Sequence, residues 1–180
     1  ARMEIAFDTT ESEKEKQQLK FTLDAEKMVT NCISALYQQN DIVETTTQVL
    51  RLFGSFLSAD RTYIIYIRDG LMYNDYEWCA DGISPQKDYL QELPLSLIER
   101  WITYFNRKEC IIIKDLEQIK ESEPDEYEVL HGQSISSLVA APLEEDGKLL
   151  GYLGVDNPPP DRIMNIAPLL QTLCYFLLLA

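Results

Sequence analysis

The chain has 180 residues, of which 46% are hydrophobic and 26% charged, a balance typical of one folded domain with an apolar core. Asp and Glu number 30 against 16 Lys and Arg, which gives a formal net charge of −14. Such a surface repels phosphate groups, so we expect this part of the chain to bind neither nucleic acid nor a membrane.

The four cysteines, Cys32, Cys79, Cys110 and Cys174, are far apart and form no CxxC pair. This spacing favours reduced thiols over a disulfide framework and predicts a cytoplasmic protein. The apolar run 166–180 is interrupted by polar residues and is shorter than the roughly 20 residues that a membrane span needs.

The first forty residues predict a short strand and then a long helix. Residues 2–7 alternate between apolar and other side chains, as a half-buried strand does. Residues 11–38 contain no Gly or Pro, and their apolar side chains recur at steps of three and four. This pattern predicts an amphipathic helix, which we interpret as a signalling or linker helix.

The next segments predict a helix, a hairpin and a further helix. Asp41 is placed to cap the first of these helices at its N-terminus. Residues 60–83 change to a period of two and contain Asp69-Gly70, a pair that favours a tight hairpin turn. Residues 95–108 then predict a helix capped by Ser96.

The second half predicts a short strand at 109–115, an acidic helix that ends near Gly132, and two strands within 136–157 joined by another Asp-Gly turn. A last helix, capped by Asn165, follows three prolines. Hairpins separated by helices favour an α+β fold: a central antiparallel sheet of about six strands, flanked by helices, with long N- and C-terminal helices.

The stretch "SISSLVAAPLEEDGKLLGYLGVDNP" resembles a GAF domain, the small-molecule-sensing fold of many signalling proteins. It carries a Leu-x-x-x-Pro-Leu strand, the Asp-Gly turn and a Leu-Gly-x-Leu-Gly return strand. The resemblance runs from about Asp41 to Ala180 and implies a GAF domain at 39–160, with a C-terminal GAF helix at 161–180 leading to an output domain.

The segments "YEWCADGI" and "LHGQSISSL" are similar to a bacterial subgroup of the family, found in sensor proteins beside a PAS domain and before a diguanylate cyclase (GGDEF) module. Residues 1–10 resemble the end of a PAS domain, which closes on Asp-Ile-Thr-Glu. Asp8, Thr10 and Glu11 match that ending and Thr9 departs from it. The alternative is that residues 1–10 are an unrelated leader.

The residues offer no catalytic constellation. His131 is the one histidine, and there is no Gly-rich phosphate loop, HExxH motif or Cys/His metal spacing. Bilin-binding GAF domains attach their chromophore through a Cys next to a His, and cyclic-nucleotide-binding members carry an Asn-Lys-x-x-x-Phe-Asp-Glu signature; both are missing here. We therefore expect no enzymatic activity of this fragment and no bilin, haem or metal, and the cofactor stays unknown.

The resemblance implies a ligand pocket between the sheet and the helices of residues 95–133. Aromatic side chains suit a small organic ligand because they combine a large apolar area with a polar tip, although they can equally be core filling. The pocket candidates are Tyr66, Tyr76, Trp78, Tyr89, Trp101, Tyr104, His131 and Asp156.

The terminal helices predict a homodimer. Apolar residues of the last helix step by four, three and four, which is typical of a coiled-coil seam. The dimer candidates are Ile33, Leu36, Ile166, Leu170, Leu173 and Leu177. In this interpretation an unidentified small molecule shifts the paired helices and so controls a downstream effector, with a diguanylate cyclase as first choice.

Two alternatives stay open. One is a ligand-free GAF domain that serves as a dimerisation spacer, which a cavity smaller than about 300 Å³ would favour. The other is an enzyme of the free methionine sulfoxide reductase kind, which an exposed, acidic Cys79 or Cys110 would favour.

Overall fold

The computed structural model describes residues 2–38 and 41–179 of the chain. In order, its elements are α1 (Arg2–Gln38), α2 (Ile42–Leu57), β1 (Arg61–Arg68), β2 (Leu71–Cys79), β3 (Leu93–Pro94), the 3-10 helix η1 (Leu95–Ile98), α3 (Glu99–Phe105), β4 (Ile111–Ile113), the 3-10 helix η2 (Leu116–Ile119), α4 (Pro124–Gly132), β5 (Leu138–Glu145), β6 (Lys148–Asp156) and α5 (Ile163–Leu179).

The described residues form one antiparallel sheet of six strands, in the order β3-β2-β1-β6-β5-β4. Its centre is two hairpins, β1-β2 and β5-β6, which join where β1 pairs with β6. Both hairpin turns are Asp-Gly pairs in the left-handed region, with φ of 51° and 78° at Asp69-Gly70 and 51° and 79° at Asp146-Gly147. The α+β fold and both hairpins are therefore confirmed.

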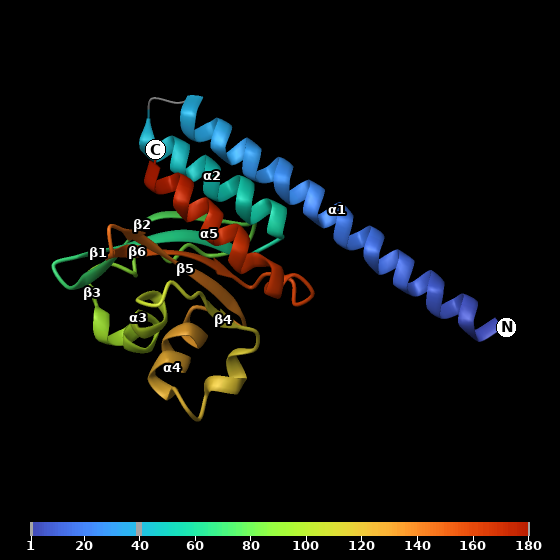
Figure 1. Cartoon of the computed structure of the whole chain (residues 1–180). Helices are drawn as coiled ribbons and strands as arrows, with labels where there is room; N and C mark the ends of the chain where they lie inside the picture. Colours follow the sequence, from blue (N-terminus) through green and yellow to red (C-terminus); the bar gives the residue numbers. More distant parts are fainter. Residues whose placement is uncertain (1, 39–40, 180) are drawn as a thin grey trace.

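Helices cover both faces of the sheet (Figure 1). On one side, here called the three-helix face, α2 and α5 pack on the sheet and α1 packs on α2 and α5. On the other side, here called the pocket face, lie α3, α4 and the long connections that lead to them. α1 and α5 run in the same direction, and the first half of α1 extends well beyond the rest of the domain.

The second helix shows how the sequence determines its own boundaries. Asp41 caps α2 through one carboxylate oxygen, which accepts hydrogen bonds from the backbone N–H groups of Val43 (2.8 Å) and Glu44 (3.1 Å), as predicted. The apolar stripe of the helix is buried against the sheet, and α2 ends at Ser58 in a left-handed conformation (φ 54°).

The strand predicted at residues 2–7 is wrong, because α1 begins at Arg2 and continues to Gln38. An isolated strand has no hydrogen-bond partner, whereas a helix satisfies its backbone within itself. The assignment of residues 1–10 to a preceding PAS-like domain stays a prediction.

Two predicted helix caps are also wrong. Ser96 lies inside η1, and α3 begins only at Glu99 without a side-chain cap. Asn165 lies inside α5, which begins at Ile163, a residue buried in the core. Burial of apolar side chains, and not a local capping preference, therefore determines where these two helices begin. Across the described residues, no helix combines the length and the apolar character that crossing a bilayer requires.

Candidate ligand pocket

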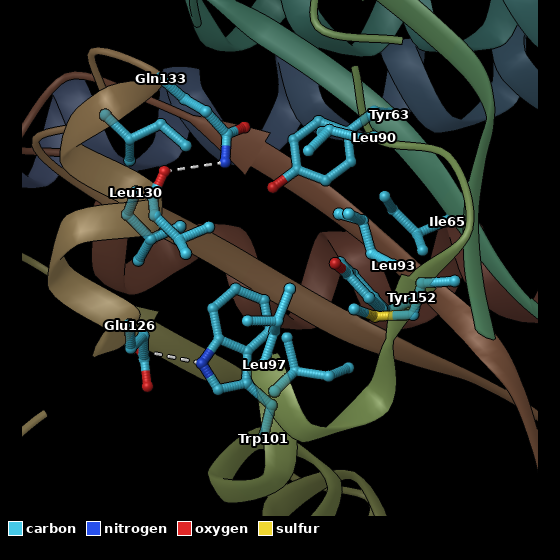
Figure 2. A pocket seen from close by; sticks show the side chains of 14 residues that line it. Tyr63, Ile65, Leu90, Leu93, Leu97, Trp101, Glu126, Leu130, Gln133 and Tyr152 are labelled. Carbon is cyan, nitrogen blue, oxygen red and sulfur yellow. Dashed lines mark hydrogen bonds between the residues drawn. The ribbon is translucent and has the colours of Figure 1, made fainter. Parts of the chain in front are cut away.

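A small, partly open cavity of about 50 Å³ lies against the pocket face (Figure 2). Strands β1, β2 and β6, the connection from β2 to α3, and helices α3 and α4 enclose it. The lining side chains are Tyr63, Ile65, Met72, Leu90, Leu93, Leu97, Ile98, Trp101, Glu126, Val129, Leu130, Gln133, Ile135 and Tyr152.

The volume of this cavity bears directly on the spacer alternative. About 50 Å³ has room for a few water molecules, whereas cavities that hold drug-sized ligands span roughly 300–1,000 Å³. The cavity described here is therefore too small for such a ligand, and by the volume criterion it favours a ligand-free domain unless a wall moves.

Aromatic rings of the sheet and of α3 meet at the cavity. The ring of Tyr152 meets those of Tyr63 (centroids 6.4 Å apart) and Trp101 (5.6 Å) edge to face, and that of Phe105 (5.6 Å) at a tilt. A glycine of the Leu-Gly-x-Leu-Gly motif makes this arrangement possible, because a Cβ at Gly154 would lie 2.3 Å from the Tyr63 ring. The glycine therefore keeps room for the ring that borders the cavity.

The polar atoms at the cavity differ in how well they are satisfied. Tyr63 donates its hydroxyl to Asp156 Oδ1 (3.0 Å), and Trp101 donates Nε1–H to Glu126 Oε1 (2.8 Å). The Tyr152 side chain is only 5% exposed, and its hydroxyl has no hydrogen-bond partner within the described part of the chain. Burial raises the pKa of Tyr152, so its hydroxyl keeps its proton.

Asp156 lies one hydrogen bond behind the cavity, in a buried cluster with Arg61. The Arg61 guanidinium donates to Asp156 Oδ2 (2.9 Å), to the Gln133 carbonyl (2.8 Å) and to the Ser84 carbonyl (3.3 Å). Burial raises the pKa of the Asp156 carboxyl to about 6, while Arg61 and Tyr63 counteract part of that rise. Arg61 thus ties the sheet to two segments that wall the cavity.

Glu126 joins the two helices of the pocket face. Its carboxylate accepts two hydrogen bonds from Arg100 of α3, at 2.6 and 2.9 Å, in addition to the one from Trp101. The bidentate pair neutralises the one ionised side chain that lines the cavity.

Few of the predicted pocket residues meet at the cavity. Trp101 lines it, and Asp156 contacts it through Tyr63. Tyr89 is 77% exposed, and Tyr104 is 37% exposed beneath Arg100. His131 is exposed and stacks on Tyr127, with ring centroids 5.3 Å apart.

Tyr66, Tyr76 and Trp78 were expected at the pocket and lie instead on the three-helix face. The pairing of β1 with β2 shifts between Ile64 and Ile65, which leaves Asp75 as an extra residue in β2. This bulge reverses the alternation, so that Met72 faces the pocket and the aromatic residues after the bulge face away.

The predicted dimer seam of the last helix faces the chain's own sheet. Ile166, Leu170 and Leu173 are at most 1% exposed in the core of the three-helix face, and Leu177 and Leu36 pack at its margin. Ile33 is half-buried. Among the side chains that the structure describes, the large apolar ones that α1 and α5 expose are instead Leu19, Leu23, Tyr37, Met164, Tyr175 and Leu179.

The cysteines do not suit redox catalysis. Burial raises the pKa of the Cys79 and Cys110 thiols to about 11, the opposite of an activated nucleophile. None of the four cysteines, all of them in described segments, lines the cavity. The described residues also contain no group of three or more His, Cys, Asp and Glu side chains that could hold a metal ion.

Comparison with known proteins identifies the fold family. The model of the GAF domain matches residues 41–177. The chain belongs to the GAF domain family. The Methanogenesis regulatory histidine kinase FilI of Methanothrix harundinacea (strain 6Ac) is 30% identical over 139 residues, which cover 69% of this chain and 14% of that kinase. This GAF domain therefore spans about a seventh of the length of its curated relative.

Solved structures agree on the fold. The phycocyanobilin-bound GAF domain from a cyanobacterial phytochrome is 16% identical with a TM-score of 0.69, and the match covers 86% of this chain and 92% of that one. The chromophore-binding domain of the bacteriophytochrome RpBphP3 from R. palustris is 14% identical with a TM-score of 0.68, covering 84% of this chain and 59% of that one. At these identities the similarity establishes the GAF architecture alone.

Proposed function

We propose that this GAF domain is a non-catalytic sensor of a small molecule in a signal-transduction protein. The observation that carries the proposal is the apolar pocket lined by the Tyr152 hydroxyl, which has no hydrogen-bond partner among the described residues. The similarity to a regulatory histidine kinase supports a signalling role.

Ligand entry requires one wall to move, and we propose the connection between β2 and α3, whose only regular structure is the short strand β3 and the 3-10 helix η1. It pairs with the sheet through the two-residue strand β3 and through the Leu90 carbonyl, which accepts from Asn74 N–H at 2.9 Å. The Glu77 carboxylate also accepts from the backbone N–H groups of Gln86 (2.9 Å) and Lys87 (3.1 Å). Opening this connection would widen the cavity, as a lid does in many ligand-binding sites.

The signal would leave through the helices. We propose that α1 and α5 pair with those of a second copy through exposed apolar side chains such as Leu23 and Tyr175. A PAS-like domain before α1 and an effector after α5 complete the proposed arrangement. The resemblance to the bacterial GAF subgroup implies a diguanylate cyclase as effector, whereas the similarity to FilI favours a histidine kinase.

The pocket does not fit phycocyanobilin, which the similar phytochrome GAF domain binds. A cavity of about 50 Å³ without a lining cysteine offers neither the space nor the attachment point for it.

Screening by thermal shift with purines, amino acids and aromatic metabolites tests the proposal, because a ligand at 100 times its Kd stabilises the fold by about 2.7 kcal/mol. The variant Leu97→Trp fills the cavity rim, and Leu52→Trp changes a half-buried leucine on the three-helix face as a matched control. A compound that stabilises the wild type and the control but not Leu97→Trp supports sensing. If no compound raises Tm, the spacer alternative, which the small cavity favours, replaces the proposal.

A further inference from the structure

The charges around the cavity restrict what it can bind. Among the described residues that line it, Glu126 alone is ionised, and no Lys or Arg lines it. The two nearby guanidinium groups, of Arg61 and Arg100, are engaged with Asp156 and Glu126. An anion would therefore enter without a free cationic partner and would lose its hydration, which is strongly unfavourable.

A cation is also disfavoured. The Glu126 carboxylate already accepts three hydrogen bonds, two of them from Arg100 and one from Trp101. Asp156 is likewise paired with Arg61 and accepts from Tyr63. Both carboxylates near the cavity are thus compensated, and a bound cation would meet no net negative charge.

The side chains at the cavity that can still form hydrogen bonds are uncharged. The Tyr152 hydroxyl can donate one hydrogen bond and accept another, and the Tyr63 oxygen can accept one because its proton is directed to Asp156. Gln133 donates to the Val129 carbonyl and keeps its amide oxygen as an acceptor. In Figure 2 the hydroxyl of Tyr63 and the side chain of Gln133 lie on the same side of the pocket, with Trp101 opposite.

We infer that the ligand is an uncharged molecule of about one aromatic ring that carries a carbonyl or amide group, bound by Tyr152. This inference rests on the proposed sensing function and adds the chemical class of the ligand. The rings of Trp101, Tyr152 and Tyr63 offer edge and face contacts to the ligand ring. The half-buried leucines of the movable wall, Leu90 and Leu93, make room for it.

Three probes of nearly the same shape test the class: benzamide (neutral), benzoate (anionic) and benzamidinium (cationic). Each is titrated into the ¹⁵N-labelled 180-residue chain while the two indole N–H signals are followed. Trp101 lines the cavity and Trp78 lies on the opposite face of the sheet, so the chain contains its own control. We expect benzamide to shift the Trp101 signal saturably and to leave Trp78 unmoved, with no shift from either ion at the same concentration.

The variant Tyr152→Phe tests the contact itself. Loss of one neutral hydrogen bond should weaken benzamide binding about two- to tenfold. Tyr66→Phe, on the neighbouring strand but on the other face, should leave the affinity unchanged.

Each other result overturns the inference. Equal or tighter binding of benzoate or benzamidinium at Trp101 would refute the neutral class and leave sensing intact. Unchanged affinity in Tyr152→Phe would refute the role of that hydroxyl. If none of the three probes shifts the Trp101 signal, the inferred ligand class is also refuted. The metabolite screen then decides separately whether the domain binds a ligand.

Discussion

Replacing Arg61 by Met should destabilise the domain more than any surface substitution. Arg61 is 3% exposed and Asp156 1% exposed, and their ion pair spans 2.9 Å between Nε and Oδ2. The methionine preserves much of the side-chain volume but leaves the carboxylate buried without its cation. It also leaves the carbonyl groups of Ser84 and Gln133 without their donor.

Removing one partner of a buried ion pair destabilises proteins by about 3–5 kcal/mol, and we expect Arg61→Met to fall in this range. The double variant Arg61→Met/Asp156→Asn removes both charges, and the asparagine can still accept the hydrogen bond from Tyr63. Its loss of stability should therefore be smaller than the sum of the two single losses, with a coupling of at least about 2 kcal/mol.

Urea unfolding, followed by circular dichroism, measures these free energies. Arg68→Met is the matched control, because Arg68 pairs with Asp75 on the surface and such pairs contribute about 0–1 kcal/mol. A loss below about 1 kcal/mol for Arg61→Met, or additive effects in the double variant, would refute the argument that this pair secures the cavity walls.

Three other predictions address the contact between α2 and the sheet, the buried carboxyl of Asp156, and the last helix. Gly54→Ala places a Cβ 2.3 Å from the Trp78 ring, so it should cost about 1–3 kcal/mol in urea unfolding. Gly132→Ala, whose Cβ meets nothing within 4 Å, should be close to neutral, and equal effects would contradict the steric explanation. Because burial raises the pKa of Asp156 to about 6 in the folded state from 3.8, the protonated form favours folding. Its contribution is therefore fully present below pH 3.8 and is lost as the pH rises through 6. Relative to Asp156→Asn, wild-type stability should fall by roughly 2 kcal/mol between pH 4 and 7, and a constant difference would refute the raised pKa. Leu170→Ala should destabilise by about 2–5 kcal/mol if its side chain is in the core; a loss under about 1 kcal/mol would mean that α5 presents this side chain outward.

The central hairpins are predictable from the sequence because their signals are local. Each needs an alternating run on both sides of a two-residue turn, and the Asp-Gly pairs supply the left-handed conformation that such a turn requires. The N-cap at Asp41 belongs to the same class, since its hydrogen bonds reach only two and three residues along the chain. Where structure depends on near neighbours, the residues alone predicted it.

Local patterns could not predict which side chains of β2 lie on which face of the sheet. Nothing in the letters "LMYNDYEWC" marks Asp75 as the extra residue of a bulge, because the bulge is defined by the pairing with β1. One unpaired residue moved Tyr76 and Trp78, two of the six aromatic residues predicted at the pocket, to the opposite face.

Three cavity residues were not predicted from the sequence, for a different reason. Tyr63 and Glu126 are important because of hydrogen bonds to residues 93 and 25 positions away in the sequence. Tyr152 is important because its hydroxyl has no hydrogen-bond partner among the described residues. Tyr63 and Tyr152 could have been suggested by alternation, since they face the same side as Ile65 and Gly154. No local signal separates Glu126 from the other acids of α4.

The seam of the last helix illustrates an ambiguity in apolar periodicity. Steps of four and three describe burial against any flat apolar surface, whether that surface is a second helix or a sheet. Here Leu170 and Leu173 pack on the sheet, and β5 is the main partner of α5. The same pattern would have appeared for a dimer seam.

The first helix closes part of the core, although the family match begins only at residue 41. Met28, Cys32 and Ala35 of α1 are at most 8% exposed and share one apolar cluster with α2 and α5. A recombinant fragment that begins at the family boundary would lack α1 and would expose apolar side chains of α2 and α5 to water. Such a shortened piece should precipitate or self-associate when it is produced, so expression plasmids for this domain should keep the whole leading helix.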